Sequence, residues 1–397
     1  MKLLVVAHAC LRAVNRTVYR HLAQRGYELR IVVPSRFGGE TCDAERPGDP
    51  PLIPLRRAGA STRFHGYRGL EQELRKFDPD IVLLDLEPDS VLAFQAGLWT
   101  RRHRRTLVIQ SCENLPQNIM AWWCSGLRKQ ALKNIFTGVI GKMTRPLVDH
   151  VFSISSAGVE VMRRAGYEGR VTRIPLGVDT ELFRPDARVR EDVRTQIGAG
   201  VDPVIAYFGR QIPQKGIHIL FEALGGLMHR PWTLLLDAFQ ANNAYAVRLQ
   251  DIATRGKFTG RIREMHARHD EVPRFMNAAD IVVAPSLTTP DFVEQYGRVV
   301  PEAMACGRTV IVSDSGALPE VLGCCGLVVP EGDPATLRTS LEGVMSELSL
   351  REELGRRALA RVEEHLSISR QVTIMDSVFH RLVTKPAMLT VGGTVTT

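Results

Sequence analysis

Two glutamates, Glu294 and Glu302, enclose a segment whose composition suits the binding of a sugar phosphate. Ionised carboxylates accept hydrogen bonds from hydroxyls, which sugars and riboses present in pairs. Gly297 lies between the glutamates and lets the backbone approach a ligand closely. Pro301 suits the first position of a helix, where its missing N–H costs nothing, and Arg298 adds a positive charge. The segment predicts a pocket in which carboxylates hold hydroxyls and amides hold an anion.

A second group of candidate residues lies in a loop between a strand-like apolar run and a helical one: Gly209, Arg210 and Lys215. Gly209 permits a sharp exit from the strand. Arg210 offers a planar fork of donors that matches a phosphate, and Lys215 adds a mobile point charge. Such cations stabilise the charge that develops on a departing nucleotide diphosphate. The loop therefore predicts a phosphate-binding site that works together with the paired glutamates.

These segments resemble the motifs of the retaining family-4 glycosyltransferases, whose two glutamates follow the pattern E-x7-E. The similarity continues through residues 302–307, a strand at 309–313 and residues 315–320. It implies an α/β chain of the GT-B fold, in which two Rossmann-like doubly wound domains face a central cleft. It also implies a hexosyltransferase-type enzyme that moves a sugar from a nucleotide-diphosphate-sugar donor to an acceptor hydroxyl with retention. No metal and no other cofactor is expected, and UDP or GDP stays open.

The resemblance assigns roles on the donor side. Glu294 would face the hydroxyls of the transferred sugar, and Glu302 would bind the ribose hydroxyls. Backbone amides around Gly297 to Val299 would hold the distal phosphate, while Arg298 would either add charge there or pair with Glu294. Family members often have a Gly-x-Gly-Pro turn where this chain reads Asp-Ala-Phe-Gln-Ala-Asn-Asn, which leaves the base undecided. The implied donor-binding residues are Gly209, Arg210, Lys215, Glu294, Tyr296, Gly297, Arg298, Val299 and Glu302, of which Arg210, Lys215 and Glu294 are also catalytic candidates.

The loop after the first predicted strand departs from the family, which often has a glycine-rich sequence there. This chain has His8, Arg12, Asn15 and Arg16 instead. Arg12 or Arg16 would supply charge to the donor phosphate in place of glycine amides, or Arg16 would face solvent on the following helix. His8, at the end of a strand, fits both a packing role and a substrate contact.

Two later strand ends complete the acceptor-side candidates. Family members often place a histidine near the reacting sugar where this chain has Glu113 and Asn114. Asp85 and Glu87 end another strand and would line the same cleft, where a general base orients an acceptor hydroxyl. Alternatively, Glu87 stands at a helix boundary, with residues 88–90 in the first turn. The acceptor-binding candidates are His8, Arg12, Asp85, Glu87 and Asn114, with Glu113 as a catalytic candidate; two carboxylates alone do not predict a metal site.

Short apolar runs alternate with amphipathic helical stretches in both halves, which is typical of parallel sheets covered on both faces. Predicted strands cover residues 3–7, 29–33, 81–85, 106–110, 150–154, 171–174, 204–208, 233–236, 281–284, 310–312 and 327–329. We predict an acceptor-side domain at 1–178 and a donor domain at 179–366, joined by a linker rich in proline and glycine. By resemblance, a helix at 367–384 crosses back onto the first domain, and 385–397 form a loose tail.

Bulk properties favour a cytoplasmic enzyme. A length of 397 residues suggests about two domains, and the seven scattered cysteines lack a C-x-x-C pair, as expected in a reducing compartment. The first apolar run is too short for a signal peptide, and none reaches the ~18 residues of a membrane span. The net charge of +8 suits anionic ligands. We expect no nucleic-acid partner, because no basic face with interleaved aromatic residues is recognisable.

One basic segment, Met120–Arg145, contains Trp122 and Trp123 and leaves two interpretations open. A basic helix with tryptophans suits the surface of an anionic membrane, which would make the protein peripheral at the inner membrane face. The same residues also suit a helix that packs on the core and has one solvated side.

The hypothesis from sequence is therefore a retaining glycosyltransferase whose acceptor is a polysaccharide, a glycolipid or a secondary metabolite. One alternative is a GT-B sugar-nucleotide epimerase or hydrolase, which would need acid and base residues that the sequence does not identify. The other is a non-catalytic partner protein that binds a nucleotide sugar, which would explain the altered loops of the first half.

Overall fold

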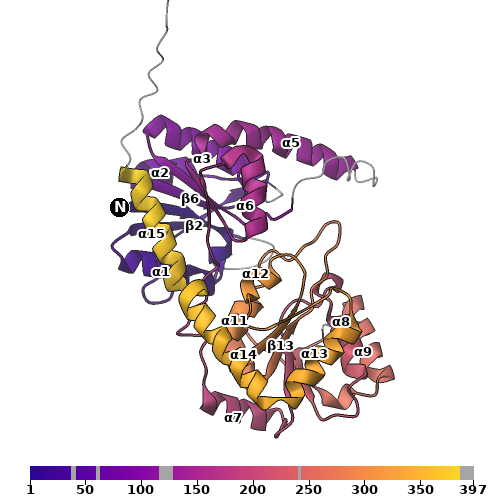
Figure 1. Cartoon of the computed structure of the whole chain (residues 1–397). Coiled ribbons are helices and arrows are strands. Elements are labelled where there is room, and N and C mark those ends of the chain that lie inside the picture. Colours follow the sequence, from indigo (N-terminus) through magenta and orange to yellow (C-terminus); the bar gives the residue numbers. More distant parts are fainter. Residues whose placement is uncertain (37–41, 60–62, 116–127, 240–242, 385–397) are drawn as a thin grey trace, which may run out of the picture.

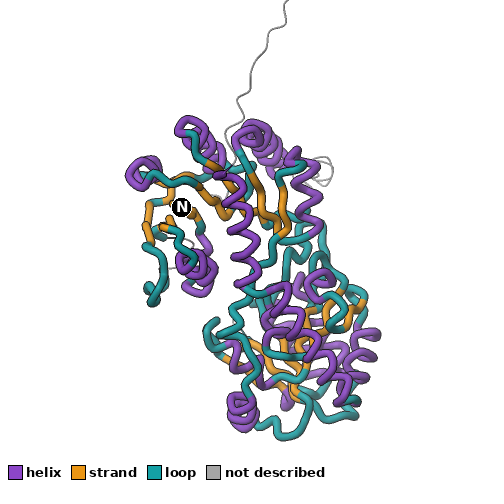
Figure 2. The backbone as a smooth tube through the Cα atoms, turned by 60° about the vertical axis from the view of Figure 1, so that its left-hand side comes forward, coloured by secondary structure: helices purple, strands orange, loops and turns teal. Residues whose placement is uncertain are grey.

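The computed structural model of the chain describes residues 1–36, 42–59, 63–115, 128–239 and 243–384, with the backbone alone at 128–134. The described residues form two long sheets. Each sheet is enclosed by helices, and the two lie in separate parts of the molecule (Figures 1 and 2). We call each sheet with its helices a domain. This architecture confirms the predicted α/β, GT-B arrangement; the exact domain boundaries stay predictions.

The first domain has seven parallel strands in the order β3-β2-β1-β6-β7-β8-β9. Its strands are β1 (Lys2–Val6), β2 (Glu28–Pro34), β3 (Leu52–Leu55), β6 (Ile81–Asp85), β7 (Thr106–Ser111), β8 (His150–Ser153) and β9 (Val171–Arg173). A small hairpin pairs β4 (Arg57–Ala58) with β5 (Gly66–Tyr67). The described helices are α1 (Thr17–Gln24), α2 (Leu70–Phe77), α3 (Val91–His103), α5 (Arg128–Thr144) and α6 (Ser156–Met162). Alternate residues of the central strands feed two separate buried clusters, so this sheet is apolar on both faces.

The second domain has six parallel strands in the order β12-β11-β10-β13-β14-β15. They are β10 (Val204–Tyr207), β11 (Thr233–Asp237), β12 (Ile262–Met265), β13 (Ile281–Ala284), β14 (Thr309–Ser313) and β15 (Leu327–Val329). Its helices are α7 (Ala187–Gln196), α8 (Ile217–Gly225), α9 (Ala244–Arg255), α10 (Val272–Ala278), α11 (Val299–Ala305), α12 (Leu318–Leu322), α13 (Pro334–Ser346) and α14 (Leu348–Arg361). Two buried clusters again lie on opposite faces of the sheet.

The last described helix, α15 (Ile368–Thr384), leaves the second domain and packs on the first, beside α1 (Figure 1). Met375 and Phe379 are fully buried in the core of the first domain. The Tyr27 hydroxyl donates to Asp376 at 2.7 Å, and Val178 pairs with Ser367 in an isolated bridge. Burial of two such side chains stabilises the docked helix by several kcal/mol, at roughly 1.5–3 kcal/mol each.

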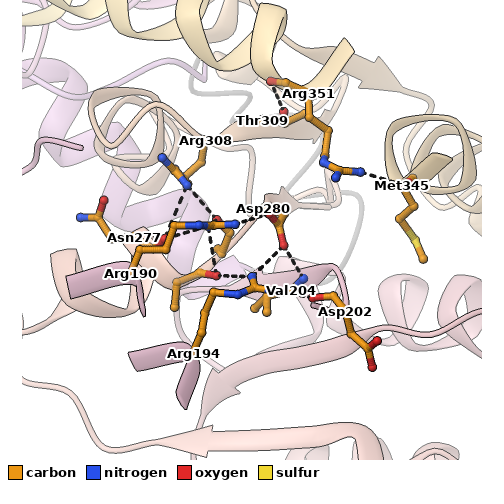
Figure 3. A network of polar contacts seen from close by, with 12 residues as sticks. Arg190, Arg194, Asp202, Val204, Asn277, Asp280, Arg308, Thr309, Met345 and Arg351 are labelled. Atoms are coloured by element: carbon orange, nitrogen blue, oxygen red, sulfur yellow. Dashed lines mark hydrogen bonds and ion pairs between the residues drawn. The ribbon is translucent and has the colours of Figure 1, made fainter. Parts of the chain in front are cut away.

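An ion cluster around Asp280 fixes the amino end of the second sheet (Figure 3). Arg190 and Arg194 from α7 reach its two carboxylate oxygens at 2.6 and 2.9 Å, and the Val204 amide donates to it at 2.7 Å. Both guanidinium groups also donate to backbone carbonyls. These contacts hold the pKa of Asp280 below its usual value against the opposing effect of burial. The cluster therefore attaches α7 to the starts of β10 and β13.

Strand order places the candidate site. In each sheet the connections change direction between two neighbouring central strands: β1 and β6 in the first, β10 and β13 in the second. Ligands of open α/β sheets bind in the crevice outside the carboxyl ends of such strands. Segments carrying His8, Glu87, Arg210 and Glu294 follow those four strands, so both switch points carry predicted site residues.

Candidate active site

The centre of the donor side is an ion pair between two predicted residues. Lys215 Nζ lies 2.5 Å from Glu294 Oε2, and the Ser286 hydroxyl donates to the same oxygen at 2.7 Å. The Glu294 side chain is only 9% exposed, whereas that of Lys215 is 19% exposed. Among the described residues no donor reaches Glu294 Oε1, so this oxygen is available to a substrate hydroxyl.

Two glycines shape the turn that carries Glu294. Gly297 and Gly316 have φ values of 71° and 54°, in the left-handed region that favours glycine. A Cβ on Gly297 would collide with Leu318, and one on Gly316 would collide with the backbone oxygen of Glu294. That oxygen also accepts hydrogen bonds from the Ala317 amide and the Asn114 side chain, each at 3.0 Å. Glycine at 297 is therefore required by this packing, while a close approach of its backbone to a ligand stays a prediction.

Glu302 lies on α11 with two basic partners. His269 Nε2 is 3.4 Å from its carboxylate, and Arg298 Nη2 is 3.7 Å away. Arg298 also donates to Asn15 of the first domain at 2.8 Å. The predicted pairing of Arg298 with Glu294 is wrong, because Lys215 occupies that position. The helix begins at Val299, two residues before the predicted start at Pro301, which stands inside its first turn.

The remaining donor-side candidates lie in two segments of the second domain, after β10 and at the start of α11. Gly209 and Arg210 follow β10, and the Arg210 side chain is exposed. Tyr296 is buried, whereas Gln295 and Arg298 of the same segment are exposed. Val299 starts α11, in whose first turn the Val300 amide donates to the Gly297 oxygen at 2.8 Å and Pro301 has no N–H.

On the acceptor side, Glu87 and Glu113 lie at neighbouring strand ends. Glu87 accepts hydrogen bonds from the Ser111 hydroxyl and, at 3.0 Å, from the Cys112 amide. Burial raises the pKa of Glu87 to about 7. The alternative that Glu87 opens a helix is wrong: α3 starts at Val91, and the Ser90 hydroxyl caps it by accepting from the Ala93 amide at 3.2 Å.

Arg63, which sequence reasoning missed, organises this wall. Its guanidinium group pairs with Asp89 and Glu113. These three residues and Glu87 line a cavity of about 370 Å³ that extends between α5 and α6. Arg63 stands in the loop between β4 and β5, where no spacing signal connects it with Glu113. A half-buried carboxylate whose pKa is raised beside a cavity is a candidate for binding an acceptor hydroxyl.

A second cavity, of about 180 Å³, lies at the switch point of the first sheet. Asp85 and Asn15 line it from the first domain, and Arg298 lines it from the second. Burial raises the pKa of Asp85, with His8 and Gln110 opposing that shift. Asn114 is almost completely buried and points to the backbone of Glu294, so it supports the donor turn.

Both predictions for Arg16 are wrong. Its side chain is completely buried and pairs with Asp49 at 3.0 Å. Its other donors reach the backbone oxygens of Cys10, Leu11, Asp43 and Ala44. Because a guanidinium group has five N–H donors, it can be buried when carbonyls surround it. Arg16 therefore ties the loop after β1 to residues 42–49, while Arg12 pairs with Asp43 at the surface.

Two other expectations, on a metal and on membrane contact, stay predictions. No group of His, Cys, Asp and Glu that could hold a metal occurs among the residues the structure describes. Trp122 and Trp123, central to the proposed membrane contact, lie outside those residues. Within the described ranges no helix has the length and apolarity of a membrane span.

Comparisons with known proteins identify the family of the chain. A family model described as Glycosyltransferase Family 4 matches residues 13–182, and one described as Glycosyl transferases group 1 matches 202–347. The GDP-mannose-dependent alpha-(1-6)-phosphatidylinositol monomannoside mannosyltransferase of Mycolicibacterium smegmatis is 31% identical over 188 residues, 46% of this chain and 49% of that protein. The matched part is thus about half of that relative's length.

Two further similarities cover more of the chain. The lipopolysaccharide core biosynthesis mannosyltransferase LpcC of Rhizobium leguminosarum bv. viciae is 25% identical over 72% of this chain and 82% of that protein. The structure of Anabaena Alr3699/HepE in complex with UDP superposes with a TM-score of 0.76 over 95% of this chain and 99% of that one, at 19% identity, which supports the fold alone. With a family model matching each domain, the chain belongs to the family-4 glycosyltransferases.

Proposed function

We propose that the protein is a retaining glycosyltransferase that moves a sugar from a nucleotide-diphosphate sugar to an acceptor hydroxyl. The observation that carries this proposal is the Lys215–Glu294 pair at the carboxyl edge of the second sheet. A lysine held by a half-satisfied carboxylate, beside a tight glycine turn, offers a cation for phosphate and an acceptor for sugar hydroxyls in one place. Family membership and the names of the relatives support the coarser part of this proposal, glycosyl transfer.

In the proposed reaction the acceptor oxygen bonds to the anomeric carbon as the bond from that carbon to the phosphate oxygen breaks. Attack comes from the face that the nucleotide leaves, so the configuration is retained. The departing phosphate oxygen takes the acceptor's proton, and the nucleotide diphosphate is released. Lys215 and Arg210 neutralise the charge on that phosphate, while Glu294 orients the sugar.

The acceptor would enter along the first domain, where Glu87 and Glu113 face the cavity of about 370 Å³. The proton on Glu87, whose pKa is about 7, would let this carboxyl donate or accept a hydrogen bond near neutral pH. Relatives are named for GDP-mannose and for phosphatidylinositol mannoside or lipopolysaccharide core. We therefore propose a glycolipid or polysaccharide acceptor and GDP-mannose as the first donor to test, followed by UDP-glucose.

The test is turnover by the Arg210→Ala/Lys215→Ala double variant. We expect kcat to fall by about 10²–10³-fold or more, because charge stabilisation of the leaving group is lost. Arg356→Ala/Arg357→Ala, on the surface of α14, is the matched control and should leave kcat unchanged. Unchanged kcat in the site variant would refute the proposal. The anomeric coupling in the product's NMR spectrum tests retention.

Two rival functions make different predictions with the same reagents. An epimerase or hydrolase would change the nucleotide sugar without any acceptor, which NMR of the donor alone would detect. A non-catalytic partner protein would bind the donor and turn over none of a broad acceptor panel. The raised pKa of Glu87 gives the hydrolase alternative one candidate base, so the incubation without acceptor is the more informative experiment.

We also propose that the enzyme works in the cytoplasm, at the inner face of a membrane. Helix α5 runs along the outer side of the first domain (Figure 1) and exposes Ile135, Phe136, Val139 and Met143. Three of these recur at helical spacing on one face, and an exposed apolar stripe beside basic residues suits an anionic lipid surface.

Co-sedimentation with vesicles tests this contact. Phe136→Ser/Val139→Ser should lose binding to vesicles that contain phosphatidylglycerol, and binding should weaken at high salt. Leu348→Ser, at an equally exposed leucine of the second domain, is the control. Binding that survives in the α5 variant would refute the docking role of these residues.

A further inference from the structure

A cavity of about 290 Å³ lies at the junction between the domains, and we call it the rear pocket. Its lining residues come from the end of β9 in the first domain, the donor turn and α12 in the second, and the connection from α14 to α15. It shares no lining residue with either of the cavities on the acceptor side described above. Any occupant would therefore touch both domains and the helix that joins them.

The charge of the rear pocket is positive. Arg173, Arg361 and Arg370 contribute three guanidinium groups against the single carboxylate of Glu320. That carboxylate is already engaged by Arg173 and by the backbone amide and hydroxyl of Ser156, at 2.9 and 3.0 Å. The exposed Arg370, on α15, is not balanced by any other acidic side chain of the lining, and His365 lines the same cavity from the preceding connection. Guanidinium forks match phosphate oxygens, so the lining selects a phosphate-type anion.

Tyr296 also lines this cavity, and its hydroxyl oxygen is buried. Tyr296 is 4% exposed, and its hydroxyl has no hydrogen-bond partner among the described residues. The Leu176 amide lies close enough to influence its pKa, but outside hydrogen-bond geometry. Glu320, Arg173 and Arg361 act on the same hydroxyl electrostatically, which places it beside the charged lining. A buried, unsatisfied hydroxyl is costly, at roughly 1–3 kcal/mol, unless a ligand or water completes it.

Tyr296 connects the rear pocket to the donor side. It stands two residues after Glu294 and directly before Gly297, so its backbone belongs to the turn that carries the catalytic candidate. A ligand that accepts a hydrogen bond from its hydroxyl would fix this turn from behind. A ligand that also holds the two domains would favour one interdomain arrangement over others.

We propose that the rear pocket binds a small phosphorylated metabolite, and that its occupancy strengthens donor binding by fixing Tyr296 and the turn around Glu294. The volume, at the lower end of the roughly 300–1,000 Å³ of ligand pockets, suits a small molecule. The binding is independent of transfer activity, whereas the coupling to the donor rests on the proposed function. By linkage, donor binding strengthens binding at the rear pocket by the same factor.

Isothermal titration calorimetry of the full chain tests the binding, with inorganic phosphate and glucose 6-phosphate as probes. The Arg210→Ala/Lys215→Ala variant should still bind glucose 6-phosphate, because these substitutions alter the donor site and leave the rear pocket unchanged. We call this variant the front-site variant. Arg370→Gln should weaken that binding by about 10-fold, as expected for a lost charge-assisted hydrogen bond, whereas Arg381→Gln on the same helix should not. Equal affinities in Arg370→Gln and Arg381→Gln, absence of binding to the wild type, or loss in the front-site variant would overturn the site.

A second measurement tests the coupling. The affinity of the donor, GDP-mannose or UDP-glucose, should rise about 5-fold when glucose 6-phosphate is present, which corresponds to a coupling of about 1 kcal/mol. Arg370→Gln should abolish this rise while leaving basal turnover unchanged. Binding at the rear pocket without any change in donor affinity would overturn the coupling. If neither donor binds under any condition, the proposed function fails, and the calorimetric result for the rear pocket stands by itself.

Discussion

The second domain carries a carboxylate cluster at each end of its sheet, and the two differ in how completely their hydrogen bonds are satisfied. At the amino end, both oxygens of Asp280 accept from guanidinium groups, and those groups also donate to backbone carbonyls (Figure 3). At the carboxyl end, the lysine and hydroxyl donors of Glu294 share Oε2. The first cluster is closed to further partners, whereas the second keeps one acceptor oxygen for a ligand.

This difference separates a structural ion pair from a binding one. Asp280 stands between fixed elements, α7 and the starts of two strands, so its pairing attaches those elements to each other. Glu294 stands on a glycine turn at a switch point, opposite the first domain, and its partner lysine has a flexible stem. Residue types alone do not make the distinction, because both clusters combine an acidic residue with basic ones.

The largest expected effect is on activity, from Glu294→Gln. The variant keeps the shape of the side chain but loses the charge that holds Lys215, so we expect kcat/KM to fall by about 10³-fold, or about 4 kcal/mol in the barrier. The melting temperature should change by less than about 2 °C, because 1 kcal/mol corresponds to roughly 1 °C for a chain of this size. Steady-state kinetics and calorimetry measure the two effects. Glu353→Gln, in an exposed pair on α14, is the control. A large loss of stability with intact kinetics would mean that this pair is structural too.

Asp280→Asn should give the opposite pattern, with a loss of about 3 kcal/mol in the free energy of unfolding and an unchanged kcat for the folded fraction. The reason is that Arg190 and Arg194 would be left partly buried without a counter-charge. Because the folded pKa of Asp280 is depressed, its stabilisation is present above the unfolded pKa of about 4 and is lost as pH falls through the folded value. Urea denaturation at pH 7 and at pH 3 should therefore show a smaller difference between variant and wild type at the lower pH.

Sequence reasoning was most successful where a signal is local. Every predicted strand is present, because strands covered on both faces read as continuous apolar runs. The unpredicted β3 and β12 are edge strands: β3 contains Pro54, and β12 carries Arg263 and Glu264, so neither forms such a run.

The site residues, too, could be predicted only where a local sequence signal marks them. Lys215 and Glu294, which the motifs identified, lie together, although their catalytic roles stay predictions. His269 and Arg63 were missed, since each meets its carboxylate only through tertiary structure. Arg16 was misjudged because no sequence pattern reveals the carbonyls that satisfy a buried guanidinium group. The number of carboxylate oxygens that accept hydrogen bonds, which distinguishes Asp280 from Glu294, also depends on tertiary structure.

Glu87 extends the comparison to a carboxylate whose pKa is raised by burial, although each of its oxygens accepts a hydrogen bond. Its raised pKa means that the folded state binds more protons than the unfolded state between about pH 4.5 and 7, so stability falls as pH rises through that window. Glu87→Gln removes this cost and should raise the free energy of unfolding at pH 8 by about 2 kcal/mol, but have little effect at pH 4. Urea denaturation at both values measures it, with the exposed Glu160→Gln as control. An equal effect at both pH values would contradict the assignment of a raised pKa.

The smallest expected effect is on donor affinity, and it tests how far the Asn114 hydrogen bond fixes the turn that carries Glu294. Asn114→Ala removes one neutral hydrogen bond across the domains, to an oxygen that still accepts from the Ala317 amide. We expect about 1 kcal/mol, seen as a 5-fold weaker donor affinity with little change in kcat, because Glu294 would stay in place but its turn would be less fixed. Asn15→Ala, which breaks the more exposed contact with Arg298, is the matched variant and should have less effect. If Asn15→Ala weakened the donor more than Asn114→Ala, the first domain would act on the donor through Arg298 and Glu302 rather than through the turn.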